Sequence, residues 1–133
     1  AHLFSTAMPG FVPVWDSHLQ MIAAATLTPQ DAVLFFSYSG ATRDLLELLE
    51  VVRERHAKVI LITHFPKSPA AALVDVILQC GANEGPLQMG SVPARIAQLF
   101  LVDILFTEVC RRNEGAVKAV RAQVADVLSS KHL

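Results

Sequence analysis

The sequence predicts an α/β fold in which helices cover both faces of a parallel sheet. Three apolar runs, at 32–36, 58–63 and 74–78, lack the alternation of inward and outward residues that marks a half-exposed strand. Segments with apolar residues at helical spacing lie between these runs, and this order favours parallel strands joined by helices. The 133 residues suit one domain, so we expect residues 1–133 to form a single three-layer α/β/α sandwich.

Four segments of the N-terminal half have recognisable patterns. Residues 11–15 are a short apolar run bounded by Pro-Gly and Asp, which predicts an edge-like strand. Apolar residues at helical spacing predict a short helix over 17–26. The uninterrupted apolar run at 32–36 predicts a strand that is buried on both faces. Residues 43–56 place leucine and valine opposite glutamate and arginine, which predicts an amphipathic helix.

The middle of the chain continues the same alternation. Residues 58–63, "KVILIT", predict a second buried strand. The Ser-Pro pair at 68–69 matches an N-cap followed by proline in the first helical position, and the short helix is expected to end near Leu73. Residues 74–78 then predict a third buried strand.

Two helices are expected at the C-terminal end. Ser91 is expected to cap a long helix that runs to about Arg112, and a valine stripe predicts a last helix over 116–129. The long helix is apolar around most of its circumference, and such a helix must be buried on nearly all sides. We therefore expect one side of it to contact another subunit, with coverage by the last helix as the alternative.

The composition excludes several classes of protein. Hydrophobic residues make up 53% of the chain and charged residues 17%, which excludes a disordered chain. With 11 basic and 12 acidic residues the net charge is -1, whereas a domain that binds nucleic acid by itself usually has a basic excess. Polar residues interrupt the apolar stretch at 96–109, so no membrane span is expected.

The sequence also predicts neither a metal nor a cofactor. Cys80 and Cys110 lack the spacing of zinc ligands or of a disulfide framework, and we expect buried thiols in a reducing cytoplasm. No other group of histidine, cysteine or acidic residues has the spacing of a metal site.

A cluster of small polar residues follows the first buried strand. Residues 37–42, "SYSGAT", open the next helix, at the carboxyl end of a strand, where parallel sheets bind ligands. A helix N-terminus offers unpaired N–H groups and a partial positive charge. The hydroxyls of Ser37, Ser39 and Thr42 can donate hydrogen bonds, and Gly40 allows a close backbone approach. These features predict a phosphate site that needs no lysine.

A purely structural explanation of the cluster remains open. Ser39 or Thr42 could cap the helix while Gly40 makes the turn, although one cap requires only one hydroxyl. The sequence contains neither G-x-G-x-x-G nor G-K-[ST], which excludes a dinucleotide fingerprint and a Walker loop.

Residues 31–78 carry a resemblance to a known family. The stretch "DAVLFFSYSGATRDLLELLEVVRERHAKVILITHFPKSPAAALVDVIL" resembles the sugar isomerase (SIS) domain, with its S-x-S-G-x-T turn, I-x-I-T strand and S-P-L-A…A-D segment. The segments "DSHLQMIAAATLTPQDAV" and "SVPARIAQLFLVDILFTEV" are similar to the SIS domain of RpiR-type bacterial transcription regulators in particular.

The resemblance implies roles for the residues of the turn. Ser37, Ser39 and Thr42 would bind the phosphate of a phosphosugar, and Gly40 and the Tyr38 backbone would shape the turn.

Two further residues are candidates for the pocket. SIS isomerases use a glutamate in the loop after the last strand for proton transfer, so Glu84 would contact sugar hydroxyls or act as a base, unless it is only a solvated loop acid. His64 follows the second buried strand and could line the pocket, with a structural role as the alternative.

The chain departs from the family pattern at its start. SIS domains begin with a Gly-rich strand, which in a flavodoxin-like strand order is central, and we expect it to be missing here. RpiR regulators also carry an N-terminal helix-turn-helix domain, which we expect to be absent from this chain.

SIS proteins are commonly dimers, so a homodimer or higher homo-oligomer is expected.

Together these features favour a non-enzymatic sensor. We expect a cytoplasmic, phosphosugar-binding domain of an RpiR-like regulator, with no catalytic residue, that changes the population of dimer arrangements and reaches DNA only through another domain. The first alternative is a phosphosugar isomerase that uses Glu84 and His64. The second is a nonbinding SIS-fold dimerisation module.

Overall fold

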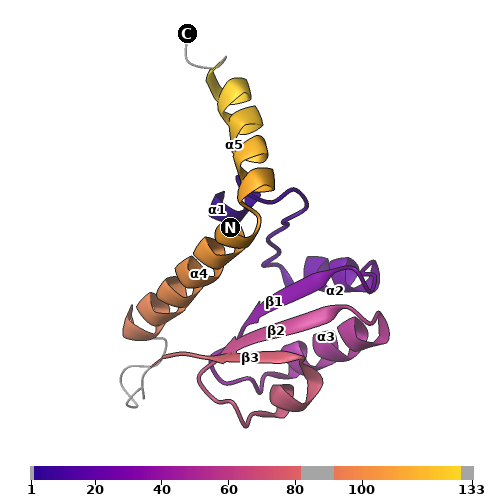
Figure 1. Ribbon diagram of the computed structural model, residues 1–133. Coiled ribbons are helices and arrows are strands. Elements are labelled where there is room, and N and C mark those ends of the chain that lie inside the picture. The colour runs from indigo at the N-terminus through magenta and orange to yellow at the C-terminus, as the bar shows by residue number, and fades with distance from the viewer. Residues whose placement is uncertain (1, 82–91, 130–133) are drawn as a thin grey trace. The chain divides into compact units, whose positions relative to one another are not determined.

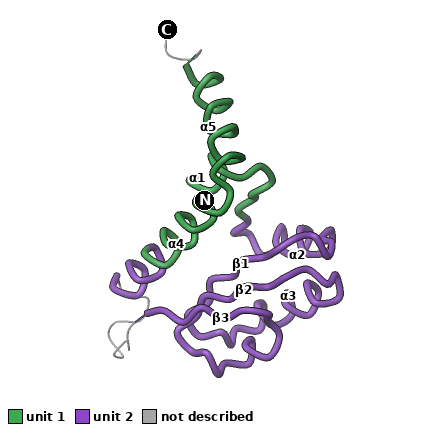
Figure 2. The backbone as a smooth tube through the Cα atoms, in the orientation of Figure 1, with its two compact units in different colours: residues 1–13, 100–133 green, residues 14–99 purple. Residues whose placement is uncertain are grey.

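The computed structural model describes residues 2–81 and 92–129 (Figure 1). These residues belong to two compact units, one spanning 14–99 and the other combining 1–13 with 100–133 (Figure 2). The elements in chain order are α1 (His2–Ser5), α2 (Ser17–Ala25), β1 (Ala32–Phe36), α3 (Arg43–Glu54), β2 (Lys58–Thr63), the 3-10 helix η1 (Pro69–Leu73), β3 (Val76–Gln79), α4 (Val92–Arg112) and α5 (Glu114–Ser129).

The unit at 14–99 contains a parallel sheet with strand order β1-β2-β3. Ala32 pairs with Lys58, and Ile60 pairs with Val76, so the three strands end at the same edge. The predicted fold class, α/β with a parallel sheet, is confirmed.

The core of this unit forms where α3 packs against the sheet. Leu49 of α3 and Leu61 of β2 are both 0% exposed, and Val52 and Val59 are buried beside them. Burying an aliphatic side chain of this size stabilises a fold by about 1.5–3 kcal/mol. The helix ends where His56 adopts a left-handed conformation, with φ 57°.

The first strand is less buried than its sequence predicts. Val33 and Phe35 pack against the core, but Phe36 is 51% exposed. β1 is an edge strand of the described sheet, whereas β2 has a neighbour on both sides. The expectation that β1 is buried on both faces is therefore wrong for the described residues. The deepest burial is in β2, where Val59, Leu61, Ile62 and Thr63 are buried.

The expected strand at residues 11–15 is absent. This segment forms no regular element, and Val12 and Trp15 are 74% and 79% exposed. A strand needs a neighbour to satisfy its N–H and C=O groups, and no strand in the described ranges pairs with this segment. Its apolar composition alone was not sufficient to form a strand.

The third strand begins later than predicted, at Val76. The preceding residue, Asp75, uses its carboxylate to accept hydrogen bonds from the Val59 N–H at 2.8 Å and from Lys58 Nζ at 2.9 Å. The Lys58 hydrogen bond, followed by the Val59 bond, lowers the pKa of Asp75. This junction fixes the register of β3 against β2 at the amino ends of the two strands.

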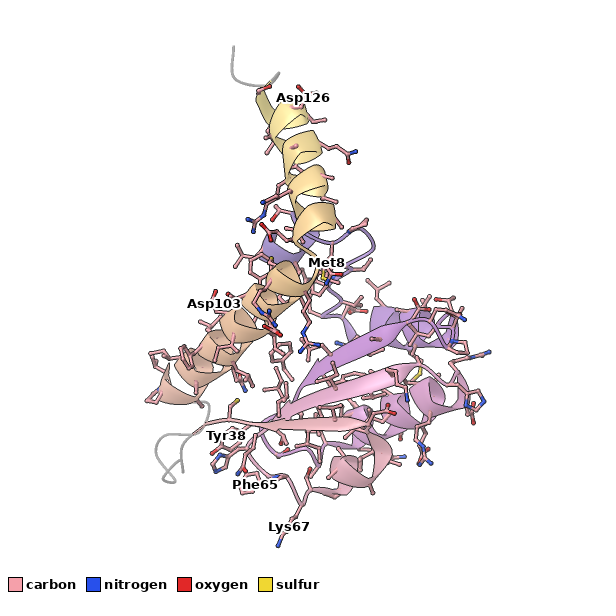
Figure 3. All side chains as sticks on the ribbon, in the orientation of Figure 1. Met8, Tyr38, Phe65, Lys67, Asp103 and Asp126 are labelled. Atoms are coloured by element: carbon pink, nitrogen blue, oxygen red, sulfur yellow. The ribbon has the colours of Figure 1, made fainter. Side chains whose placement is uncertain are left out.

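The other unit has a small aromatic core. The Phe4 ring stacks on Phe11 with centroids 4.9 Å apart and meets the Phe106 ring of α4 edge-on at 5.2 Å. Val117 of α5 is buried in the same cluster, and Met8, labelled in Figure 3, packs against it. α5 begins earlier than the sequence suggests because Gly115 is accommodated within the helix.

Candidate functional site

The hydroxyl-rich turn lies where β1 ends, beside the loop that follows β2. The Ser37 N–H donates to the Ile62 carbonyl at 3.0 Å, and the His64 N–H donates to the Tyr38 carbonyl at 3.1 Å. The Thr63 hydroxyl also donates to the Tyr38 carbonyl, at 3.0 Å. These bonds hold the two loops together at the carboxyl edge of the sheet, as the sequence predicts for residues 37–42.

Gly40 packs directly against Ser68 of the second loop and the segment that follows it. It is buried, has φ 60°, and its carbonyl accepts a hydrogen bond from the Ala70 N–H at 3.0 Å. A Cβ at this position would lie 2.2 Å from Ser68 Oγ. Both the left-handed backbone and the lack of space require glycine here.

Two hydroxyls of the turn accept hydrogen bonds from its own backbone. Ser37 Oγ accepts from the Gly40 N–H at 3.1 Å, and Ser39 Oγ accepts from the Ala41 N–H at 3.3 Å. A hydroxyl has two lone pairs and one proton, so accepting a bond leaves its proton available to an external acceptor. Both serines thus shape the turn while remaining potential donors to an anion.

Thr42 is the N-cap residue of α3, but its side chain makes no capping hydrogen bond. Its carbonyl accepts the first helical bond, from the Leu46 N–H at 3.2 Å. The first N–H groups of α3 have no partner inside the helix and carry the positive end of its dipole. A capping role for the Thr42 hydroxyl is therefore not seen, and the Thr42 side chain leaves the first N–H groups of α3 uncapped.

An aromatic cluster joins the turn to the loop after β2. The rings of Tyr38 and His64 stack with centroids 5.0 Å apart, and the Phe65 ring meets both edge-on. Gly81, with φ 110°, packs beside this pair of rings, since a Cβ there would lie 3.4 Å from His64 Nδ1. His64 thus lies at the predicted edge, packed against the side chain of Tyr38.

A hollow of about 430 Å³ opens beside the turn. Figure 3 shows Phe65 and Lys67 at this end of the unit, with Lys67 reaching outward. The lining residues are Ser39, Phe65, Pro66, Lys67, Ser68 and Pro69. No ligand role was predicted from the sequence for the last five of them, although the Ser-Pro pair after the second strand marked their position.

Other predicted features have different outcomes. Glu84 lies outside the described residues. Within residues 2–81 and 92–129, no group of three histidine, cysteine or acidic side chains could hold a metal ion. Over the same ranges, none of the helices combines the length and apolar character that a bilayer crossing requires.

Cys80 and Cys110 are free and only partly buried, and burial raises the pKa of the Cys80 thiol.

Comparison with known families and sequences gives consistent matches. The family model described as the SIS domain matches residues 1–108. An uncharacterised HTH-type transcriptional regulator of Caldanaerobacter subterraneus is 33% identical over 118 residues, which are 89% of this chain and 42% of that protein. The HTH-type transcriptional regulator RpiR of Escherichia coli is 40% identical over 98 residues, which are 74% of this chain and 33% of that protein. The chain thus spans less than half the length of these curated relatives.

Solved structures share the fold. The Vibrio vulnificus NanR protein complexed with ManNAc-6P has a TM-score of 0.85 at 22% identity, covering 97% of this chain and 48% of that one. The sugar isomerase domain of an RpiR transcription factor from Sphaerobacter thermophilus has a TM-score of 0.76 at 23% identity, covering 94% and 68%. A putative phosphosugar isomerase from Bacteroides fragilis has a TM-score of 0.69 at 29% identity, covering 86% and 62%.

Replacing Gly40 with alanine tests the packing of the turn. The new Cβ would add left-handed strain and a clash with Ser68, which together should cost about 2–4 kcal/mol in the free energy of unfolding. Urea denaturation followed by circular dichroism measures this loss.

Two other glycines provide matched controls for this substitution. Gly10→Ala adds a left-handed residue in open space and should cost about 1–2 kcal/mol, while Gly115→Ala lies in a helix with open space and should be neutral or stabilising. Equal losses for Gly40→Ala and Gly10→Ala would show that contact with Ser68 is unimportant.

Proposed function

The chain belongs to the SIS domain family, and on that premise we propose that it is the phosphosugar-sensing domain of an RpiR-like transcription regulator. The proposal treats residues 1–133 as part of one SIS domain. The observation that carries it is the turn at the sheet edge. There the Ser37 and Ser39 hydroxyls accept bonds from the backbone of the turn, and Thr42 leaves its hydroxyl unused as a cap.

The phosphate would bind at the N-terminus of α3. The Ser37, Ser39 and Thr42 hydroxyls would donate to its oxygens, because the two serines use their lone pairs, not their protons, inside the turn. Gly40 and the Tyr38 backbone would keep the turn close to the ligand. The helix dipole favours an anion at this position.

The sugar would extend from this site toward the neighbouring loops. In the proposal Glu84 contacts sugar hydroxyls, and His64 lies nearby through its stacking on Tyr38. The NanR protein, which shares the fold, was solved in complex with ManNAc-6P, and this supports a sugar phosphate as the ligand class.

Regulation would pass through an attached DNA-binding domain. The relatives cited above are named as HTH-type transcriptional regulators and are more than twice as long as the stretch they share with this chain. A net charge of -1 fits a domain that senses a ligand while another part of the protein binds DNA. A cytoplasmic location, where the DNA of a bacterium lies, is part of this proposal.

An isomerase is the second candidate, because the Bacteroides fragilis neighbour is named as a putative phosphosugar isomerase. The curated relatives cited here are regulators, which favours the sensor. Interconversion of aldose and ketose requires a base that moves a proton between adjacent carbons. Incubating a bound sugar phosphate with the protein and following it by NMR separates the two, since turnover would contradict a pure sensor.

The proposal also includes self-association through α4. One side of this helix carries exposed apolar residues at helical spacing, which are Val92, Ile96, Leu99, Phe100 and Ile104. Leu99 and Phe100 are each 68% exposed. A second copy of the chain would bury this stripe and couple ligand binding to the arrangement of the dimer.

Thr42→Ala tests the phosphate site. The variant removes a donor that makes no capping bond, so the fold should keep its stability while the dissociation constant for a sugar phosphate rises about ten- to a hundredfold, the value of a charged hydrogen bond. Thermal shifts measure this, since a ligand at a hundred times its dissociation constant adds about 2.7 kcal/mol.

The panel contains sugar phosphates, the matching sugars without phosphate, and inorganic phosphate. Ser17→Ala, which removes an exposed hydroxyl from α2, is the control and should bind as the wild type does. A wild-type protein that responds to no member of the panel would favour the nonbinding dimerisation module.

Phe100→Glu tests the interface on α4. A charge in a buried apolar interface is strongly unfavourable, so the variant should be monomeric under conditions where the wild type is a dimer. Light scattering after gel filtration gives the mass. Ala119→Glu introduces the same charge at an exposed position on α5 and should leave the dimer intact. A monomeric wild type would rule out this part of the proposal.

A further inference from the structure

The hollow beside the hydroxyl turn has a well-defined second wall. Its backbone is fixed by hydrogen bonds from the Phe65 N–H to Thr63 Oγ1 at 3.2 Å and from the Ser68 N–H to the Phe65 carbonyl at 3.1 Å. The Ala70 N–H then bonds to the Gly40 carbonyl. The loop at 65–69 is thus anchored both to the end of β2 and to the turn itself.

Ser68 shows that this anchoring depends on packing. Its Oγ is buried and has no hydrogen-bond partner within the described part of the chain, and its side chain does not cap η1. The oxygen lies against Gly40, where a Cβ would otherwise be. The preceding residue, Lys67, is therefore held at a fixed point of the backbone next to the turn.

Lys67 is the cation best placed for a ligand in this hollow. Lys67 lines the hollow together with Ser39, is exposed, and makes no ion pair with any residue that the structure describes. Arg43, at the start of α3, binds Glu47 one turn further along the helix, at 2.7 Å. Lys58 binds Asp75 at the opposite end of β2.

The turn alone provides no full positive charge. Its hydroxyls and N–H groups contribute dipoles, whereas a phosphate monoester carries between one and two negative charges near neutral pH. Asp44, in the first turn of α3, adds a negative charge close to the same helix end. A cation on the opposite wall of the hollow would compensate this charge and favour phosphorylated over neutral ligands.

We propose that Lys67 is a further ligand-binding residue, whose ammonium group contacts the phosphate, or an acidic substituent of the sugar, from the second wall of the hollow. This inference rests on the proposed function, because it assigns a residue to the same site. It assigns the charge selectivity of the site to the loop at 65–69 and the hydrogen-bond geometry to the turn at 37–42. Phe65, Pro66 and Pro69 would face the apolar side of the sugar.

Lys67→Gln tests the assignment by isothermal titration with hexose phosphates, N-acetylhexosamine phosphates and inorganic phosphate. Loss of one partly exposed ion pair should weaken binding of the best phosphorylated ligand about fivefold. The remaining binding should depend less on ionic strength than that of the wild type. Lys67→Arg keeps the charge and should restore most of the affinity and its salt dependence.

Arg53→Gln is the matched control, because it removes one exposed positive charge from the far end of α3. It should change neither the affinity nor its salt dependence. If Lys67→Gln binds like the wild type while Thr42→Ala is impaired, the role of Lys67 is wrong and the proposed function stands. If the wild type binds none of the phosphorylated compounds, both are wrong.

Discussion

The contact between Gly40 and Ser68 is the constraint on which the candidate site depends. The two residues belong to loops that follow neighbouring parallel strands, and the Gly40 carbonyl binds the Ala70 N–H at 3.0 Å. Because glycine has no Cβ, the turn can approach Ser68 closely and take a left-handed conformation at Gly40. The serine hydroxyls can then close the turn from within, and Thr42 can start α3 without a side-chain cap.

Much of this arrangement could be predicted from the sequence. Uninterrupted apolar runs gave the correct strands at 32–36 and 58–63, and strand polarity placed the hydroxyl turn at the carboxyl edge. The segment at 11–15 has a similar composition but forms no strand, because composition does not supply a hydrogen-bonding neighbour. For the same reason the run at 32–36 predicted more burial than an edge strand has.

The site was predicted less completely than the fold. The turn can be recognised because its polar residues are close together in sequence. Lys67 and Ser68 are brought near it only by the pairing of β1 with β2. The contact of Gly40 with Ser68 spans residues far apart in sequence, so its distance could not be read from the motif. The prediction of a phosphate site without a lysine concerned the turn alone, whereas Lys67 lines the hollow from the neighbouring loop.

Whether the turn at 37–42 binds a phosphorylated sugar is best decided by an NMR titration that follows each backbone amide. We expect a sugar phosphate to shift the amides of residues 39–44 most strongly and those of residues 65–69 next. The matching sugar without phosphate should leave the amide resonances of both segments unchanged. Shifts confined to α4 and α5, or equal shifts with and without the phosphate, would contradict binding at the turn.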